Sequence, residues 1–128
     1  MKISELLNAY PALNRLYDKK FKDYNTVRRI VKLKNTADTE INFYSEQERK
    51  LIEQYALRDE YGNPKITDGN KIEFENTETK YAYDEEIKKL LDVDVTIEKV
   101  KLSEKDFMPE DFPTPADMSA LACIIDFE

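Results

Sequence analysis

The 128-residue sequence contains no histidine, no tryptophan and a single cysteine, Cys123. Without histidine the chain lacks the side chain used by most zinc sites, by serine and cysteine triads, and by acid–base catalysis near neutral pH. One cysteine excludes an intrachain disulfide and favours a reducing compartment. We therefore expect no enzymatic activity, no cofactor and no bound metal.

Glycine is also scarce, with two residues, and no apolar run approaches the ~18 residues that span a bilayer. The N-terminus lacks the apolar core of a signal peptide, so we expect no membrane association. Hydrophobic residues make up 41% of the chain, and its 14 aromatic residues are unusual for a disordered protein. These features favour one folded domain over residues 1–128 that is rich in long regular elements.

Charge divides the chain into two halves. Residues 1–58 have a net charge of +4 and residues 59–128 a net charge of −11, within a total of −7. The densest basic stretch supplies a candidate interaction surface, formed by Arg15, Lys19, Lys20, Lys22, Arg28, Arg29 and Lys32. This stretch either contacts a partner or is neutralised within the fold by the acidic half, and we favour the second interpretation. Nucleic acid is an unlikely partner at this total charge and a pI near 4.8.

Two helices are predicted for residues 1–57, forming a long helical hairpin. Apolar residues recur at steps of three and four over residues 3–17, where Pro11 predicts a kink or a division into two pieces. The same spacing continues over residues 24–57 without glycine or proline. Residues 34–40 contain poor helix formers, so this second helix is either continuous or broken near 35–40, with Asp38 or Thr39 capping its second part.

The second half predicts a small β part. Turn-forming residues over 58–75, with Asp68-Gly69 at their centre, predict a two-stranded ribbon. We expect a helix over 76–92, capped by Asn76 or Thr77, and a strand over 93–102 with a bulge at Glu98-Lys99. The spacing of acidic residues in the ribbon does not match a calcium-binding loop.

An acidic, proline-containing loop over 103–114 holds three apolar side chains that are expected to pin it, and a C-terminal helix is predicted over 115–126. Thr114 precedes Pro115 and Asp117 in the order typical of a capped helix start. The predicted fold class is therefore mainly α with a small β part (α+β). It consists of the long helical hairpin, the short β-ribbon and strand region, and the C-terminal helix.

Each chemically suggestive pattern has a simpler structural explanation. Asp92 and Asp94 could share a metal or a proton, but strand alternation explains them as a solvated face. Cys123 has no histidine partner and is expected to be a small buried hydrophobic residue. Most of the eight tyrosines fall on the apolar stripes of helices and are expected to pack there.

Three landmarks point to a family. They are the N-terminal pair of helices with its basic stretch, the segment EQERKLIEQYALRDEYGNP over Glu46–Pro64, and the segment PADMSAL over Pro115–Leu121 that follows an acidic tail. Together they resemble small uncharacterised proteins of phages and prophages from low-GC Gram-positive bacteria. The chain departs from that pattern at Ala122-Cys123-Ile124, where such tails often continue with Glu-Pro-Phe. The resemblance implies a phage origin and a non-enzymatic role.

We expect a protein that acts by surface contacts with a phage structural protein or a host protein, as an accessory or assembly component of the virion or tail. A homo-oligomer is plausible because long helices with apolar stripes commonly find a second copy. The alternative is a phage counter-defence protein whose acidic surface mimics nucleic acid and blocks a host nuclease. Either role places the protein in the cytoplasm of the bacterial host, and the first extends to the virion.

Overall fold

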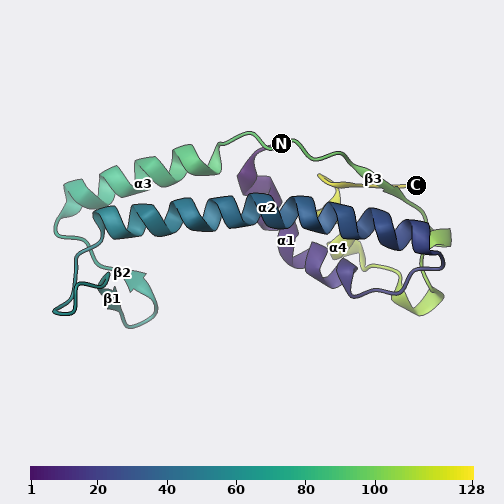
Figure 1. Ribbon diagram of the computed structural model, residues 1–128, viewed down its shortest axis with the longest axis horizontal. Helices are drawn as coiled ribbons and strands as arrows, with labels where there is room; N and C mark the ends of the chain where they lie inside the picture. The colour runs from purple at the N-terminus through teal and green to yellow at the C-terminus, as the bar shows by residue number, and fades with distance from the viewer. The chain divides into compact units, whose positions relative to one another are not determined.

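The computed structural model describes residues 1–128 and confirms a mainly helical fold with a small β part (Figure 1). Its helices and strands are α1 (Ile3–Tyr17), α2 (Tyr24–Tyr55), β1 (Ile66–Thr67), β2 (Lys71–Ile72), α3 (Thr77–Leu91), β3 (Val100–Leu102), α4 (Pro115–Leu121) and β4 (Ile125–Phe127). Two compact units share α2: unit 1 is Met1–Ile41 with Asp94–Glu128, and unit 2 is Asn42–Val93. The organisation as one domain stays a prediction.

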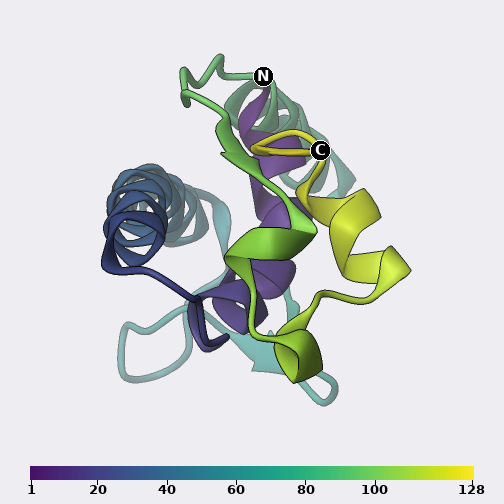
Figure 2. The ribbon, with the colours of Figure 1, turned by 90° about the vertical axis from the view of Figure 1, so that its right-hand side faces the viewer.

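The core of unit 1 is built around α1. Its apolar residues at steps of three and four, from Ile3 to Leu16, are at most 1% exposed. Helices α2 and α4, strands β3 and β4 and the segments that join these elements contribute further buried apolar side chains, which are Ile30, Leu33, Ala37, Val95, Leu102, Phe107, Leu121, Ile124 and Ile125. Figure 2 shows these elements arranged around α1, which is drawn in purple. The C-terminal segment therefore returns to cover the first helix of the chain.

The predicted division of the first helix at Pro11 is wrong, because α1 runs unbroken from Ile3 to Tyr17. Pro11 removes one backbone donor, and its own side chain is exposed. Ala9 and Ala12 on either side of it are both buried in the same core. Burial on both sides of the proline therefore outweighs the single lost hydrogen bond.

The second helix is continuous, so the alternative of a break near 35–40 is excluded. Ala37, in the middle of the weak stretch, is fully buried. The hydroxyls of Thr36 and Thr39 donate to the carbonyl oxygens of Lys32 and Asn35, one turn earlier, at 3.0 and 3.1 Å. Poor helix propensity at these positions is thus overridden by core contacts, as is common for weak propensities.

The strand predicted over 93–102 is much shorter in the structure, where only Val100–Leu102 is a strand. A strand needs a neighbour to pair with, and residues 96–99 have none. Val95 pairs instead with Met1, whose carbonyl oxygen accepts its N–H at 2.7 Å. The bulge predicted at Glu98-Lys99 is consequently also wrong.

The predicted helix over 115–126 ends early, at Leu121, and the chain continues as β4. The start of α4 is as expected, with the Thr114 hydroxyl accepting the N–H of Asp117 at 3.2 Å. Strand β4 pairs with β3 in parallel, Val100 opposite Ile125 and Leu102 opposite Phe127. Ile124 lies in the turn that follows the helix and Ile125 begins β4, and burial of these two β-branched side chains explains why the helix stops before them.

Aromatic side chains pin the acidic loop 103–114, as predicted. Phe107 is 1% exposed and its ring lies 5.1 Å from that of Phe21 and 5.4 Å from that of Phe112. The loop forms two 3-10 turns, η1 (Glu104–Asp106) and η2 (Pro109–Asp111). These turns keep the loop close to the connection between α1 and α2, where the N–H of Lys22 donates to the carbonyl oxygen of Asp106 at 3.0 Å.

Unit 2 contains the second half of α2, the ribbon and α3. The predicted ribbon is confirmed: β1 and β2 are antiparallel, and Gly69 (φ 88°) and Asn70 (φ 61°) take the left-handed backbone that this turn requires. Asn76 caps α3, its side-chain oxygen accepting the N–H of Thr79 at 2.8 Å. The rings of Tyr55 on α2 and Tyr83 on α3 lie 6.3 Å apart.

Replacing Phe107 by alanine is expected to lower the free energy of unfolding by about 3–5 kcal/mol, because it removes a fully buried ring and leaves a cavity. Phe112→Ala is the matched control, since Phe112 is 37% exposed and should cost less than half as much. Urea unfolding followed by circular dichroism measures both. Equal losses for the two variants would contradict the role of Phe107 as the anchor of this loop.

Candidate functional site

The structure does not gather the predicted basic surface into one patch. Arg15, the first residue of this surface in the sequence, forms an ion pair with Asp117 of α4. Its Nη2 lies 2.7 Å and its Nε 3.1 Å from Oδ1 of the carboxylate. The hydrogen bond from Arg15 lowers the pKa of Asp117 below its usual value. This ion pair joins the basic N-terminal part to the acidic C-terminal part within unit 1, but the other six residues of the predicted surface form no ion pair, so neutralisation of the whole stretch stays a prediction.

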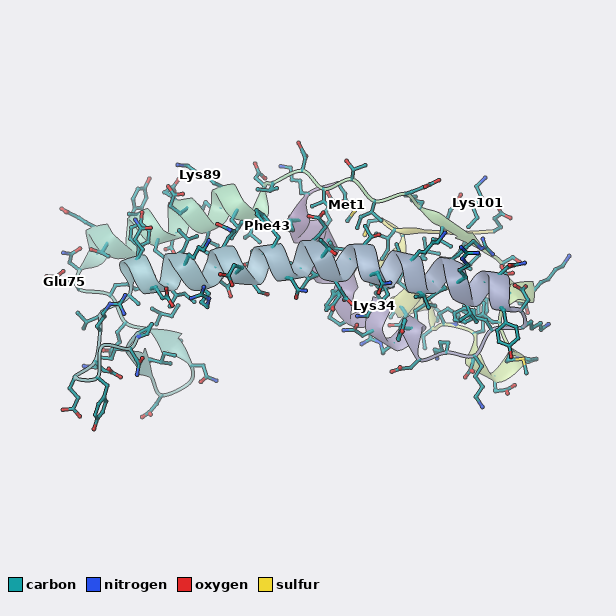
Figure 3. All side chains as sticks on the ribbon, viewed as in Figure 1. Met1, Lys34, Phe43, Glu75, Lys89 and Lys101 are labelled. Atoms are coloured by element: carbon teal, nitrogen blue, oxygen red, sulfur yellow. The ribbon has the colours of Figure 1, made fainter.

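Lys34 is also engaged within the fold. Its Nζ lies 2.6 Å from Oδ1 of Asp38, which also accepts a short hydrogen bond from the Tyr10 hydroxyl. The same ammonium lies 5.1 Å from the ring centre of Tyr10 and 5.6 Å from that of Tyr17, within cation–π range. The cluster ties α1 to α2, and Figure 3 shows Lys34 on the side of α2 away from Lys101.

The connection between the two helices is held through its backbone. The N–H of Lys20 donates to Asp111 at 2.8 Å. The side chains of Lys20, Lys22 and Arg28 are exposed and that of Lys19 is half-buried, and none of the four forms an ion pair. None of these four residues lines the groove formed by the remaining two.

A groove of about 590 Å³ in unit 1 is lined in part by the last two residues of the predicted basic surface, Arg29 and Lys32. Its other wall is the segment that leads into β3, and it is lined by Arg29, Lys32, Leu33, Thr36, Ile97, Glu98, Lys99, Val100 and Lys101. Figure 2 shows α2 on one side of this segment and β4 on the other. Four cationic side chains therefore face one carboxylate around an apolar base.

Lys99 and Lys101 were missed as site residues by sequence reasoning. In the sequence they alternate with Glu98, Val100 and Leu102, a pattern that indicates only the solvated face of a strand. Their position opposite Arg29 and Lys32 depends on tertiary packing between residues about 70 positions apart. The alternating pattern indicated that both lysines are exposed, but nothing in the neighbouring sequence indicated that they would lie opposite Arg29 and Lys32.

Unit 2 presents a second surface, which is apolar. Only Ala56 and Leu90 in this unit are buried. Apolar side chains on its two helices are half-covered, and they include Tyr44, Leu51, Ile52, Tyr55, Tyr83, Ile87 and Leu91. Six large apolar residues of the unit are exposed, namely Phe43 (43%), Leu57 (36%), Tyr61 (81%), Ile66 (59%), Tyr81 (66%) and Val93 (36%). We call this the half-covered surface of unit 2.

The remaining candidates carry little chemistry. Cys123 is half-buried rather than buried, and burial raises the pKa of its thiol, which disfavours a reactive thiolate. No three acidic or cysteine side chains lie close enough together to hold a metal ion. The prediction that most of the eight tyrosines pack on helical stripes holds for four at most, because Tyr17, Tyr24, Tyr61 and Tyr81 are exposed. No helix combines the length and apolar composition needed to cross a bilayer.

Asp38→Asn is expected to destabilise the protein by about 1 kcal/mol at neutral pH, after discounting for solvent screening, because it weakens the contacts to Lys34 and Tyr10. Burial tends to raise the pKa of Asp38, but the hydrogen bonds from Lys34 and Tyr10 outweigh it and leave the pKa lowered. A lowered carboxyl pKa stabilises the fold when the pH is above the ordinary pKa of about 3.9, and this contribution is lost as the pH falls through the folded pKa.

Urea unfolding at pH 7 and at pH 3 measures this dependence, with Glu40→Gln as the control because Glu40 lies on the same helix without an ion pair. The difference between wild type and Asp38→Asn should shrink at the lower pH. A difference of the same size at both pH values would show that the carboxylate charge is not what stabilises this cluster.

Comparison of the chain with models of protein families, with curated proteins and with solved structures finds no match. The resemblance to phage and prophage proteins stays a prediction. The functional argument therefore depends on the two surfaces of this chain, the basic groove of unit 1 and the half-covered surface of unit 2.

Proposed function

We propose that this chain is a non-enzymatic interaction protein of phage or prophage origin, which serves as an accessory or assembly component of the virion or tail. The half-covered surface of unit 2 is the observation that carries this proposal. A unit of this size folds stably when its apolar faces are covered, yet only two of its residues are buried. A protein partner is the natural cover for such a surface.

A second copy of the chain fits this surface by simple geometry. Two antiparallel helices form one layer, and packing that layer against a symmetry-related one creates a four-helix arrangement with a shared core. Aromatic residues, which are enriched at protein interfaces, make up six of the 13 residues given for this surface, and the rings of two of them, Tyr55 and Tyr83, lie 6.3 Å apart. Self-association through unit 2 is thus the first contact to test.

The charge of unit 2 favours a second candidate, the nucleic-acid mimic that blocks a host nuclease. The unit has 13 acidic and 8 basic residues, a net charge of −5. We rank it second because basic residues are interspersed among the acidic ones, so the surface of the unit is not uniformly negative. On α3, for example, Nζ of Lys88 lies 3.3 Å from Oε1 of Glu85. Nζ of Lys89 lies 3.1 Å from Oε1 of Glu86.

Phe43→Asp is expected to weaken self-association roughly tenfold or more, because it places a charge in the apolar contact. Tyr24→Asp is the matched control, since Tyr24 is an exposed aromatic residue of the same helix that lies in unit 1. Sedimentation equilibrium over a range of concentrations gives the association constants. Wild-type association should tighten as salt rises, because like-charged units repel less and apolar contact persists.

A wild-type protein that stays monomeric at every concentration, or two variants that behave alike, would remove self-association from the proposal. Circular dichroism at each condition shows whether a variant has lost its fold.

Affinity capture from phage-infected cells separates the two candidate functions. The tagged chain should retain capsid or tail proteins at both low and high salt, because apolar contacts resist screening. Phe43→Asp should retain less of them, while Tyr24→Asp should behave as wild type. Retention of a host nuclease at low salt only, released when salt rises, would contradict the assembly role and support the mimic.

A further inference from the structure

Strand β3 has one paired edge and one free edge. The N–H of Val100 donates to the carbonyl oxygen of Ile124 at 3.1 Å, and the carbonyl oxygen of Leu102 accepts the N–H of Glu128 at 2.8 Å. Both residues therefore direct their backbone groups toward β4. Because backbone groups point alternately to the two sides of a strand, those of Lys99 and Lys101 point away from β4.

No backbone segment covers this second edge. The only partner there is a side chain, since Nη1 of Arg29 donates to the carbonyl oxygen of Lys101 at 3.0 Å. The same guanidinium donates from Nη2 to the Thr26 hydroxyl at 3.2 Å, which fixes it against α2. The backbone N–H groups of residues 96–99 donate to no other segment of the chain. An exposed edge with unused donors and acceptors is a template for another strand.

The surroundings of this edge are cationic. Lys32, Lys99 and Lys101 line the same groove, are all exposed and form no ion pair, and Glu98 is the only acidic residue that lines it. Leu33, Ile97 and Val100 give the groove an apolar base. A ligand for it therefore needs negative charge, apolar groups and a backbone able to pair with a strand.

We propose that the basic groove of unit 1 binds an extended acidic peptide segment of a partner protein, which adds as a strand to the free edge of β3. An extended chain meets all three requirements at once, because its backbone pairs with the free N–H and C=O of Lys99 and the N–H of Lys101 while its side chains alternate between apolar base and cations. A nucleic acid supplies the charge but has no backbone that continues the ladder. This inference is independent of the proposed function, which rests on unit 2.

The test uses a fluorescent synthetic peptide in which glutamate alternates with valine, titrated with the full-length protein and read by fluorescence anisotropy. Binding should weaken as salt rises and should fall roughly tenfold or more in Lys99→Glu/Lys101→Glu. Lys19→Glu/Lys20→Glu carries the same change in charge outside the groove and should keep most of the affinity. Lys32→Glu, on the exposed face of α2, is the second groove variant if the double variant is unstable.

A second peptide, N-methylated at every amide, has the same side chains and charge but has no backbone N–H to donate to a strand edge. It should bind far more weakly, and amide chemical shifts of residues 97–101 should move only with the unmodified peptide. Equal binding of the two peptides would overturn strand addition, and equal losses in the groove and control variants would overturn the groove as the site. No binding, or displacement by an oligonucleotide of equal charge, would overturn the choice of ligand.

Sedimentation of the groove variants keeps this test separate from the proposed function. Lys99→Glu/Lys101→Glu should self-associate as the wild type does, because the change lies in unit 1. A variant that loses peptide binding and keeps self-association supports the groove proposal by itself. Loss of both properties together would overturn the independence of the two surfaces.

Discussion

The burial of α1 is the constraint on which the rest of unit 1 depends. Its apolar side chains from Ile3 to Leu16 lie in the core, and one helix cannot cover them. Helix α2 covers one part, and the chain must return from more than 90 residues away to cover the rest with α4 and β4. That return pairs β4 with one edge of β3 and leaves the other edge facing the groove beside α2.

Net charge describes this protein poorly because it averages over distinct local environments. Unit 1 brings the basic N-terminal part together with the acidic C-terminal residues, for 12 basic against 14 acidic residues. The ion pair of Arg15 with Asp117 and the Lys34 cluster use some of these charges internally. The groove nevertheless keeps four cations beside one carboxylate, so a unit of net charge −2 has a locally cationic surface.

Helical periodicity was sufficient to predict α1, α2 and α3, because the spacing of apolar residues records which side of a helix is buried. The caps at Asn76 and Thr114 were equally local and were predicted correctly. Strand β4 was missed because its three residues are a strand only through pairing with β3, a partner about 25 positions away. Helix propensity at residues 34–40 left open whether α2 is continuous or broken. The burial of Ala37 and the contact of Asp38 with Lys34 belong to the continuous helix.

The residues of the candidate site also divide into those that the local sequence indicates and those that only tertiary packing brings together. Arg29 and Lys32 belong to a basic stretch that is visible in the sequence, whereas Lys99 and Lys101 join them only in the folded unit. Arg15 and Lys34 lie in the same stretch but have internal partners, which no count of charges could reveal. A site assembled from two distant segments, one helical and one extended, has no signature in either segment alone.

Helix α2 passes from a well-buried environment into a sparsely buried one without a break. Its residues 24–41 contribute to a dense core, whereas the only buried residues of unit 2 are Ala56 and Leu90. Stability along one helix is then unequal, and amide hydrogens beyond residue 41 should exchange with solvent through local openings that leave unit 1 intact. A partner that covers unit 2 must also restrict its backbone motion, which lowers the affinity per unit of area and favours rapid exchange between bound and free chains.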